Sequence, residues 1–180
     1  MPPEIEVKIK IEDVEDIKKR ILKIKAELFK HRHLEVDEYF DNRNKLKNTD
    51  QLLRLRDNCI FTYKGPQKRK QKMKIREEIE LLIDDGNKFK QILEKLGYIY
   101  VKRKEKYRES YILGRTQITI DETPMGNYIE VEGSKETVPK IVKRLGFAEK
   151  DMINKTYTDI WEAYAKKNNL KGDMIFNGNN

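Results

Sequence analysis

The 180-residue sequence predicts an α+β protein in which antiparallel strands form one sheet system and helices pack against it. Along many short segments charged and apolar residues alternate, which is the period of a strand with one apolar face. Other segments carry apolar residues three or four positions apart, which is typical of an amphipathic helix. A Glu-Ile-Glu or Glu-Val-Glu strand precedes a polar turn and a helical segment at residues 4–6, 78–80 and 130–132. The irregular period of this repeat favours β-then-α units in one sheet over a solenoid.

The first half of the chain is expected to consist mostly of strands. Residues 4–11 alternate strictly, and Asp13 can cap a helix whose apolar stripe ends at Leu28. Asp57 and Asn58 predict a tight hairpin turn between two strands. The strands expected after the first helix are residues 35–40, 52–56, 59–64 and 72–83.

The second half is expected to alternate helices with strands. A helix at residues 87–96 should end at Gly97, because glycine readily adopts the left-handed conformation that closes a helix. Ser134 and Thr156 are expected to cap two further helices, the first of which ends at Gly146. Strands are expected at residues 99–112, 117–122 and 128–132.

The composition is highly charged but typical of a folded domain. Lys and Arg number 39 against 31 Asp and Glu, which gives a net charge of +8, and the mean hydropathy is −0.87. Aromatic and β-branched residues recur throughout, which argues against disorder. The length predicts one domain at residues 1–168 and a Gly/Asn-rich tail at residues 169–180 that should be frayed.

Membrane and secreted classes are not expected. The apolar segments fall well short of the ~20 residues that a membrane span needs. The first residues lack a basic stretch followed by an apolar one, so no signal peptide is expected. Cys59 is the single cysteine and cannot form a disulfide within the chain, which fits a cytoplasmic location.

Charged residues stand two positions apart in nearly every expected strand and therefore share a face. They are Glu4, Glu6 and Lys8; Arg54 and Arg56; Arg76, Glu78 and Glu80; Lys106 and Arg108; and Glu130 and Glu132, with Lys64 and Asp121 in similar positions. Any one pair could belong to an ordinary solvent face. Their recurrence favours a charged interior if the strands curl, and such an interior must be filled because unpaired buried charges are costly. A polyphosphate with divalent metal ions would fill it, since Arg and Lys bind phosphate and Glu binds hard cations.

The segment Glu4-Ile5-Glu6-Val7-Lys8 resembles the ExExK signature of the CYTH family, the triphosphate tunnel metalloenzymes that include class IV adenylyl cyclases and thiamine triphosphatases. Over residues 4–165, further segments resemble the family's motifs in the same order. They are Tyr39-Phe40-Asp41, Leu53-Arg54-Leu55-Arg56, Thr62-Tyr63-Lys64-Gly65-Pro66, Arg76-Glu77-Glu78, Lys106-Tyr107-Arg108-Glu109-Ser110-Tyr111, Ile118-Thr119-Ile120-Asp121, Gly126-Asn127-Tyr128-Ile129-Glu130-Val131-Glu132 and Lys155-Thr156-Tyr157. ExExK alone is a weak pattern, but the ordered set is specific.

The resemblance implies a closed, tunnel-like antiparallel β-barrel of about eight strands with helices packed outside. It also implies Mg²⁺ or Mn²⁺ as the cofactor and a triphosphate as the substrate. The triphosphate would be bound by Lys8, Arg54, Arg56, Lys64, Arg76, Lys106 and Arg108. The metal would be held by Glu4, Glu6, Glu130 and Glu132, with Glu78, Glu80 and Asp121 as further tunnel acids. The catalytic residues so implied are Glu4, Glu6, Lys8 and Arg108.

Three functions remain open at this point. Lys64-Gly65-Pro66 and the segment with Lys106 and Arg108 resemble the class IV cyclase branch, which favours conversion of ATP to cyclic AMP and pyrophosphate. A triphosphatase acting on inorganic tripolyphosphate, thiamine triphosphate or a nucleoside triphosphate needs the same groups. A non-catalytic module that binds RNA or polyphosphate is the alternative of another class. A homodimer is also left open.

Other notable residues have ordinary explanations. The basic segment at residues 64–74 could bind nucleic acid, but without interleaved aromatic residues a solvated hairpin loop is favoured. His31 and His33 with Asp37 could suggest a metal site, but polar residues in a helix-to-strand connection explain them. Trp161 is expected to pack the last helix against the sheet.

Overall fold

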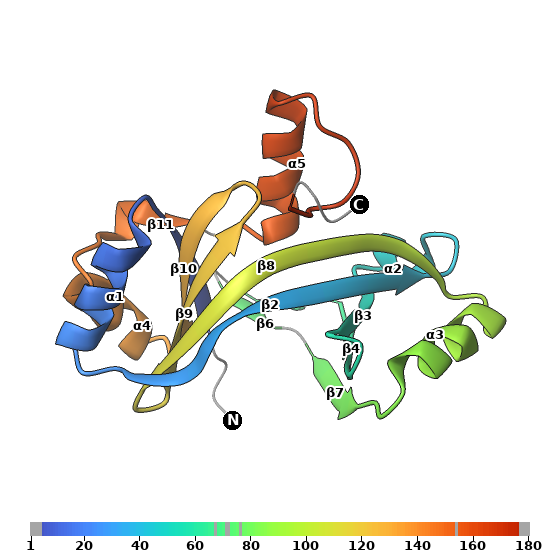
Figure 1. Ribbon diagram of the computed structural model, residues 1–180, viewed down its shortest axis with the longest axis horizontal. Helices are drawn as coiled ribbons and strands as arrows, with labels where there is room; N and C mark the ends of the chain where they lie inside the picture. Colours follow the sequence, from blue (N-terminus) through green and yellow to red (C-terminus); the bar gives the residue numbers. More distant parts are fainter. Residues whose placement is uncertain (1–4, 67, 71–72, 76, 154, 177–180) are drawn as a thin grey trace. The chain divides into compact units, whose positions relative to one another are not determined.

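The computed structural model describes residues 5–66, 68–70, 73–75, 77–153 and 155–176. In these residues nine strands form one sheet, in the order β11-β1-β10-β9-β8-β2-β3-β4-β7, and β5 pairs with β6. The strands are β1 (Ile5–Ile11), β2 (Glu27–Asp41), β3 (Leu52–Arg56), β4 (Ile60–Lys64), β5 (Lys68–Lys70), β6 (Met73–Ile75), β7 (Glu78–Leu82), β8 (Ile99–Leu113), β9 (Thr116–Thr123), β10 (Gly126–Gly133) and β11 (Met152–Ile153). The helices, most of them labelled in Figure 1, are α1 (Val14–Lys23), α2 (Lys45–Asn48), α3 (Gly86–Lys95), α4 (Thr137–Arg144) and α5 (Tyr157–Lys167), with a 3₁₀ turn at Glu149–Asp151. None of the helices in these residues is long and apolar enough to cross a membrane.

The hydrogen-bonded sheet has two free edges in the described part of the chain. β11 and β7 lie at these edges, and no strand pair joins them. Closing a sheet into a barrel would require such a pair. The strand pairs with a defined register are antiparallel. The predicted antiparallel α+β fold is therefore confirmed, whereas its closure into a barrel is not.

The described residues divide into two compact units. The first unit takes residues 5–34, 106–171 and 176, and the second takes residues 35–105 and 172–175. β2 and β8 contribute to both units because each is 15 residues long. The single domain expected at residues 1–168 stays a prediction.

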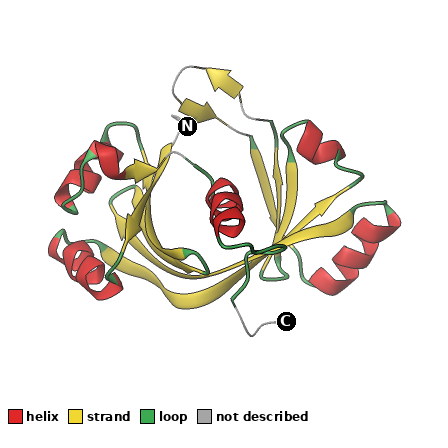
Figure 2. Ribbon diagram, turned by 90° about the horizontal axis from the view of Figure 1, so that it is seen from above, coloured by secondary structure: helices red, strands yellow, loops and turns green. Residues whose placement is uncertain are grey.

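In the first unit, one face of the sheet is apolar and packs against α1 and α4. Ile9 of β1, Ile120 of β9 and Ile129 of β10 are at most 2% exposed. Ile21 of α1 and Val138 of α4 belong to the same cluster. Figures 1 and 2 show α1 and α4 on one side of these strands and α5 on the other. Because strand residues alternate, the neighbours of the buried isoleucines point towards the side on which α5 lies.

In the second unit, α3 packs on the sheet through a smaller core. Phe40 of β2, Leu55 of β3 and Leu93 of α3 are buried there. Phe61 of β4 meets Phe89 of α3 edge to face, with ring centroids 4.6 Å apart. The alternate residues of β2, β3 and β4 again point to the opposite face.

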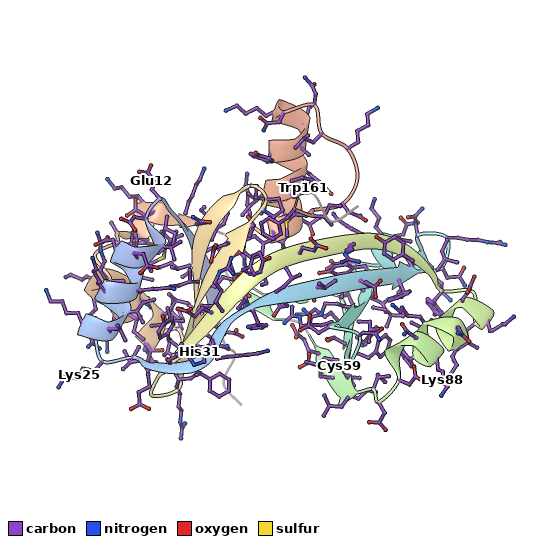
Figure 3. All side chains as sticks on the ribbon, in the orientation of Figure 1. Glu12, Lys25, His31, Cys59, Lys88 and Trp161 are labelled. Atoms are coloured by element: carbon purple, nitrogen blue, oxygen red, sulfur yellow. The ribbon has the colours of Figure 1, made fainter. Side chains whose placement is uncertain are left out.

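The structure corrects the predicted end of the first helix. α1 ends at Lys23, because Lys25 adopts a left-handed backbone conformation (φ +63°) that a helix cannot continue. Lys25 is labelled in Figure 3, at the turn that leads into β2. Leu28, predicted to extend the helical stripe, lies in β2 and is 42% exposed.

β2 is consequently longer than predicted, since it begins at Glu27 and not at residue 35. His31 and His33 lie within this strand and not in a connection, and His33 Nδ1 is 2.8 Å from the His31 carbonyl oxygen. In the described residues no three His, Cys, Asp or Glu side chains gather closely enough to hold a metal ion. The predicted strand at residues 72–83 is divided into β6 and β7, and Arg76 lies outside the described residues.

Predicted turns and caps are confirmed at several places. Asp57 and Asn58 both have positive φ (50° and 57°), as a tight hairpin of this kind requires. The Asp13 side chain accepts a backbone N–H from the first turn of α1. Thr156 and Asp159 form a reciprocal capping box at the start of α5.

Part of the segment predicted as a frayed tail pairs with β8. The Met174 N–H donates to the Arg103 carbonyl at 3.2 Å, and the Glu105 N–H donates to the Met174 carbonyl at 2.7 Å. Met174 is 1% exposed. Residues 177–180 lie outside the described residues.

Candidate functional site

The polar face of the first unit carries a group of charged residues that we name the first cluster. It consists of Glu6 and Lys8 of β1, Lys106 and Arg108 of β8, Asp121 of β9 and Glu130 of β10. The register of the antiparallel strands places Lys8 opposite Glu130 and Arg108 opposite Asp121. The same alternation that buries isoleucines under α1 and α4 therefore collects charges on the other face.

Asp121 is the fully buried acid of the first cluster, with 0% of its surface exposed. Arg108 Nε donates to it at 2.7 Å, Lys106 Nζ at 3.2 Å and Tyr157 Oη at 2.8 Å. A buried carboxylate without such donors would be strongly destabilising. Asp121 therefore fixes the positions of two basic side chains.

Glu130 ties Arg108 to Lys8, which lies 3.0 Å from it. Burial alone would raise the pKa of Glu130, but the positive charges of Arg108, Lys106 and Lys8 outweigh burial and hold this pKa well below 4.5. Burial likewise opposes the charge of Lys8, yet Glu130 and Glu6 raise the pKa of its ammonium group above 10.5. Both groups are therefore charged at neutral pH.

Glu6 is the acid of the first cluster that is not fully compensated. Its side chain is 42% exposed and forms an ion pair with Lys8. Desolvation by the surrounding protein raises the pKa of Glu6, and the Glu130 carboxylate raises it further. Glu6 also stands opposite Glu132, which is exposed. Like charges at neighbouring positions destabilise a strand pair unless a cation lies between them.

These carboxylates have the chemistry that a divalent metal ion requires, although no three of them gather closely enough in the described residues to form a complete site. Glu6, Glu130 and Glu132 lie on one face of two paired strands and offer the hard oxygen donors that Mg²⁺ and Mn²⁺ prefer. Glu4, the fourth predicted metal ligand, lies outside the described residues.

Tyr157, at the start of α5, contacts the first cluster from outside the sheet. Besides its bond to Asp121, its ring centroid lies 5.1 Å from Lys8 Nζ and 5.2 Å from Lys106 Nζ. Burial, Glu130 and Asp121 together raise the pKa of the Tyr157 hydroxyl well above 10, so that it remains a neutral donor. Tyr157 thus holds two lysines and one acid in place.

We expect Tyr157→Phe to lower the free energy of unfolding by about 1.5–3 kcal/mol, the usual worth of a hydrogen bond to a charged group. Urea denaturation would measure the change. Tyr164→Phe is the matched control, because Tyr164 stacks on Trp161 and has no side-chain hydrogen bond among the described residues. Equal losses in the two variants would contradict the assigned role of the Tyr157 hydroxyl.

The second unit carries another charged group, which we name the second cluster. Arg56 of β3 donates to Asp37 of β2 from Nε at 2.7 Å and from Nη2 at 3.1 Å, and its Nη2 lies 3.0 Å from Glu35. Arg54 donates to Thr62 at 2.9 Å and to Glu80 at 3.4 Å. Two arginines are thus fixed side by side on one strand face.

The margins of the second cluster add two further contacts. Lys104 Nζ lies 4.6 Å from the ring centroid of Tyr39, the pKa of whose hydroxyl is raised by burial and by the nearby Asp37. Lys64 pairs with Glu78 at 2.6 Å across β4 and β7. Lys104 and Lys64 therefore add two basic side chains to the two arginines of the second cluster.

The predicted site residues fall into three groups. The first cluster unites Glu6, Lys8, Lys106, Arg108, Asp121 and Glu130, with Glu132 exposed on the same strand face. The second cluster unites Arg54, Arg56 and Glu80, with Lys64 and Glu78 paired beside them. Glu4 and Arg76 lie outside the described residues.

Some residues of these clusters were not among the predicted site residues. They are Glu35, Asp37, Tyr39, Thr62, Lys104 and Tyr157. Period-two spacing could have found Lys104, which stands two positions before Lys106 on one strand. It could also have found Glu35, Asp37 and Tyr39.

Known proteins resemble this chain in sequence and in fold. The sequence matches the CYTH domain model over residues 2–157. A Methanocaldococcus jannaschii protein named as a candidate adenylate cyclase is 33% identical over 172 residues, which cover 87% of this chain and 97% of that protein. A structure of a candidate adenylate cyclase from Vibrio parahaemolyticus has a TM-score of 0.78 at 18% identity, covering 89% of this chain and 98% of that one.

A further structure, of a candidate adenylyl cyclase from Hippeastrum described as having a dominant triphosphatase activity, has a TM-score of 0.64 at 17% identity. It covers 89% of this chain and 95% of that one. The family model matches most of the sequence, and the match to the Methanocaldococcus jannaschii protein covers 97% of that protein. The chain therefore belongs to the CYTH domain family.

Proposed function

We propose that this chain is a metal-dependent enzyme acting on a triphosphate, and that it converts ATP to cyclic AMP and pyrophosphate. The observation that carries the proposal is the first cluster, where buried Lys8 and Lys106 and half-buried Arg108 lie beside the acids Asp121 and Glu130. Basic groups fixed in this way are suited to neutralise phosphate oxygens in a ground state and a transition state.

The charges of the first cluster explain why a metal would be required. Three basic groups (Lys8, Lys106, Arg108) face three acids (Glu6, Asp121, Glu130), so the cluster is neutral when all are ionised. A triphosphate that entered alone would bring about four uncompensated negative charges into a poorly solvated place. Mg²⁺ or Mn²⁺ held by Glu6, Glu130 and Glu132 would supply the missing positive charge and polarise the phosphoryl group.

The side chains of this chain would mainly bind and orient the substrate. Arg108 reaches Asp121 and Glu130 together and keeps its guanidinium plane fixed for a phosphate oxygen. Lys8 and Lys106, both close to the Tyr157 ring, add two point charges. In the proposed reaction the ribose 3′-hydroxyl attacks the α-phosphorus, and the bond from that phosphorus to the pyrophosphate oxygen breaks.

Hydrolysis is the second candidate, and the Hippeastrum relative favours it because its described activity is mainly that of a triphosphatase. Water would then attack the terminal phosphorus with the same basic groups and metal ions. A module that binds polyanions without turnover would use the basic groups alone.

One assay separates these functions. The purified protein is incubated with ATP, tripolyphosphate or thiamine triphosphate, each with Mg²⁺ or Mn²⁺, and products are separated by chromatography. We expect cyclic AMP and pyrophosphate from ATP. ADP and phosphate would identify the triphosphatase, and binding without any product would identify the polyanion module.

Arg54 and Arg56 of the second cluster are proposed as phosphate ligands. We expect Arg54→Ala to raise the KM for a triphosphate more than for a monophosphate, because only the longer anion gains from extra basic groups. Arg56→Ala should do the same and should also lower the free energy of unfolding, since the buried Asp37 and Glu35 lose their ion pairs with Arg56. Steady-state kinetics with both substrates checks this, and equal changes in the two KM values would contradict it.

A further inference from the structure

The first unit contains a surface pocket of about 390 Å³ that the proposed reaction does not use. It lies where the C-terminal ends of α1 and α4 meet, and it is lined by Arg20, Lys23, Ile24, Arg144, Leu145 and Gly146. Both helices lie on the same side of the sheet (Figure 1) and pack on its apolar face, whereas the first cluster lies on its polar face. Its volume is within the range of pockets for small ligands.

The two helix ends are joined by a reciprocal pair of arginines. Arg20 of α1 donates from Nη1 to the Leu145 carbonyl at 3.2 Å, and Arg144 of α4 donates from Nη2 to the Ile24 carbonyl at 3.0 Å. Such capping is a normal role for a basic residue at a helix C-terminus. It uses only a small part of each guanidinium, which carries five N–H donors.

The basic groups of the pocket exceed what its acids can neutralise. Arg20 pairs with Asp16 at 2.6 Å, whereas neither Lys23 nor Arg144 pairs with a carboxylate in the described part of the chain. Three positive charges therefore outnumber one carboxylate and the partial negative charges, roughly half a charge each, of the two helix C-termini. Capping explains Arg20 and Arg144, whereas Lys23 has no ion-pair partner in the described residues.

Gly146 contributes the space that this arrangement needs. Its backbone is left-handed (φ +87°), and a Cβ at this position would lie 2.9 Å from Arg20 Nη1. Any larger residue would strain the turn and press on the guanidinium group. The glycine therefore both ends α4 and leaves room for Arg20 in the pocket.

We propose that this pocket binds a small phosphate-bearing anion. Two guanidinium groups match phosphate oxygens in geometry and an ammonium group adds a mobile charge, so a divalent anion is favoured over a monovalent one. An apolar ligand would leave the same charges unpaired, and a metal cation would be repelled.

The test is an NMR titration of the full chain with inorganic phosphate against chloride at matched ionic strength. We expect saturable shifts of the Gly146 and Lys25 amides, with a dissociation constant on the order of 1 mM because exposed charge pairs are individually weak. The double variant Lys23→Gln, Arg144→Gln should bind at least about tenfold more weakly, equivalent to 1.4 kcal/mol. Lys19→Gln, an exposed neighbour on α1 outside the pocket lining, is the control and should match the wild type.

Linear, unsaturated shifts at Gly146, or equal affinity in the double variant and the wild type, would overturn the proposal. If the double variant does not fold, the single variant Lys23→Gln still tests the pocket. It should fold normally, because Lys23 is exposed and has no ion-pair partner in the described residues. Shifts of the Asp121 and Glu130 amides in the same spectra report on the first cluster. Absence of phosphate binding at this pocket and absence of binding at the first cluster are therefore measured at different amides.

Discussion

Glu6→Gln is expected to abolish metal-dependent turnover while leaving the fold intact. Glu6 stands near Glu130 and opposite Glu132, so it is the acid whose charge most needs a cation. A metal ion can supply several kcal/mol of transition-state stabilisation, and each 1.36 kcal/mol is tenfold in rate. We therefore expect kcat to fall by about 100-fold or more.

The stability of this variant distinguishes a metal ligand from a structural residue. Because the pKa of Glu6 is raised, its ionised form is disfavoured in the metal-free fold, and a neutral amide removes that penalty. Thermal unfolding without metal should therefore show no loss, whereas Mn²⁺ should stabilise the wild type more than the variant. Glu12→Gln, exposed just beyond β1 and labelled in Figure 3, is the control. Full activity of Glu6→Gln with both metals would end the metal assignment.

The strand alternation explains how much of the site was predictable. Lys8 was identified because it alternates with Val7 and Ile9, which pack in the core, and Lys106 and Arg108 because they stand two positions apart around Tyr107. The pairing of Asp37 with Arg56 and that of Tyr157 with Asp121 could not be predicted in this way. Arg56 is 19 positions from Asp37 and Asp121 is 36 positions from Tyr157, and only the folded register brings these atoms together.

The exposed start of β2 explains why the predicted end of the first helix was wrong. The first six residues of β2, beginning at Glu27, are all exposed, so no apolar face imposes a period on them. Ile24 is buried and stands at helical spacing from Ile21, so the sequence favoured a longer helix. The left-handed Lys25 ends that helix, and a lysine carries none of the signal that a glycine would give. The prediction that the sheet closes into a barrel depended on the family resemblance. The residue pattern within a strand does not show which strand lies beside it.

Arg108→Gln is expected to have the largest effect on stability. Arg108 bonds two acids, Asp121 and Glu130, which are 0% and 8% exposed. Breaking a buried ion pair by removing one partner costs about 3–5 kcal/mol, because the remaining charge stays buried. Arg32→Gln is the matched control, since Arg32 forms an equally bidentate pair with Glu122 but its side chain is 44% exposed. That exposed pair should contribute only about 0–1 kcal/mol. Urea denaturation at neutral pH compares the two variants.

The pH dependence of the stability difference between the wild type and Arg108→Gln tests whether charge is its cause. The basic neighbours depress the pKa of Glu130, so this group stabilises the fold above the unfolded pKa of 4.5, and that stability is lost as the pH falls through the depressed folded pKa. Without Arg108 the folded pKa should rise towards 4.5, which reduces this contribution. The gap between wild type and Arg108→Gln should therefore be widest at neutral pH and should narrow in acid, where Glu130 is protonated in both. Adding Glu130→Gln to Arg108→Gln should recover part of the lost stability at pH 7, because the buried charge is then absent. A gap that is constant between pH 7 and pH 3 would mean that Arg108 stabilises by packing and not by charge.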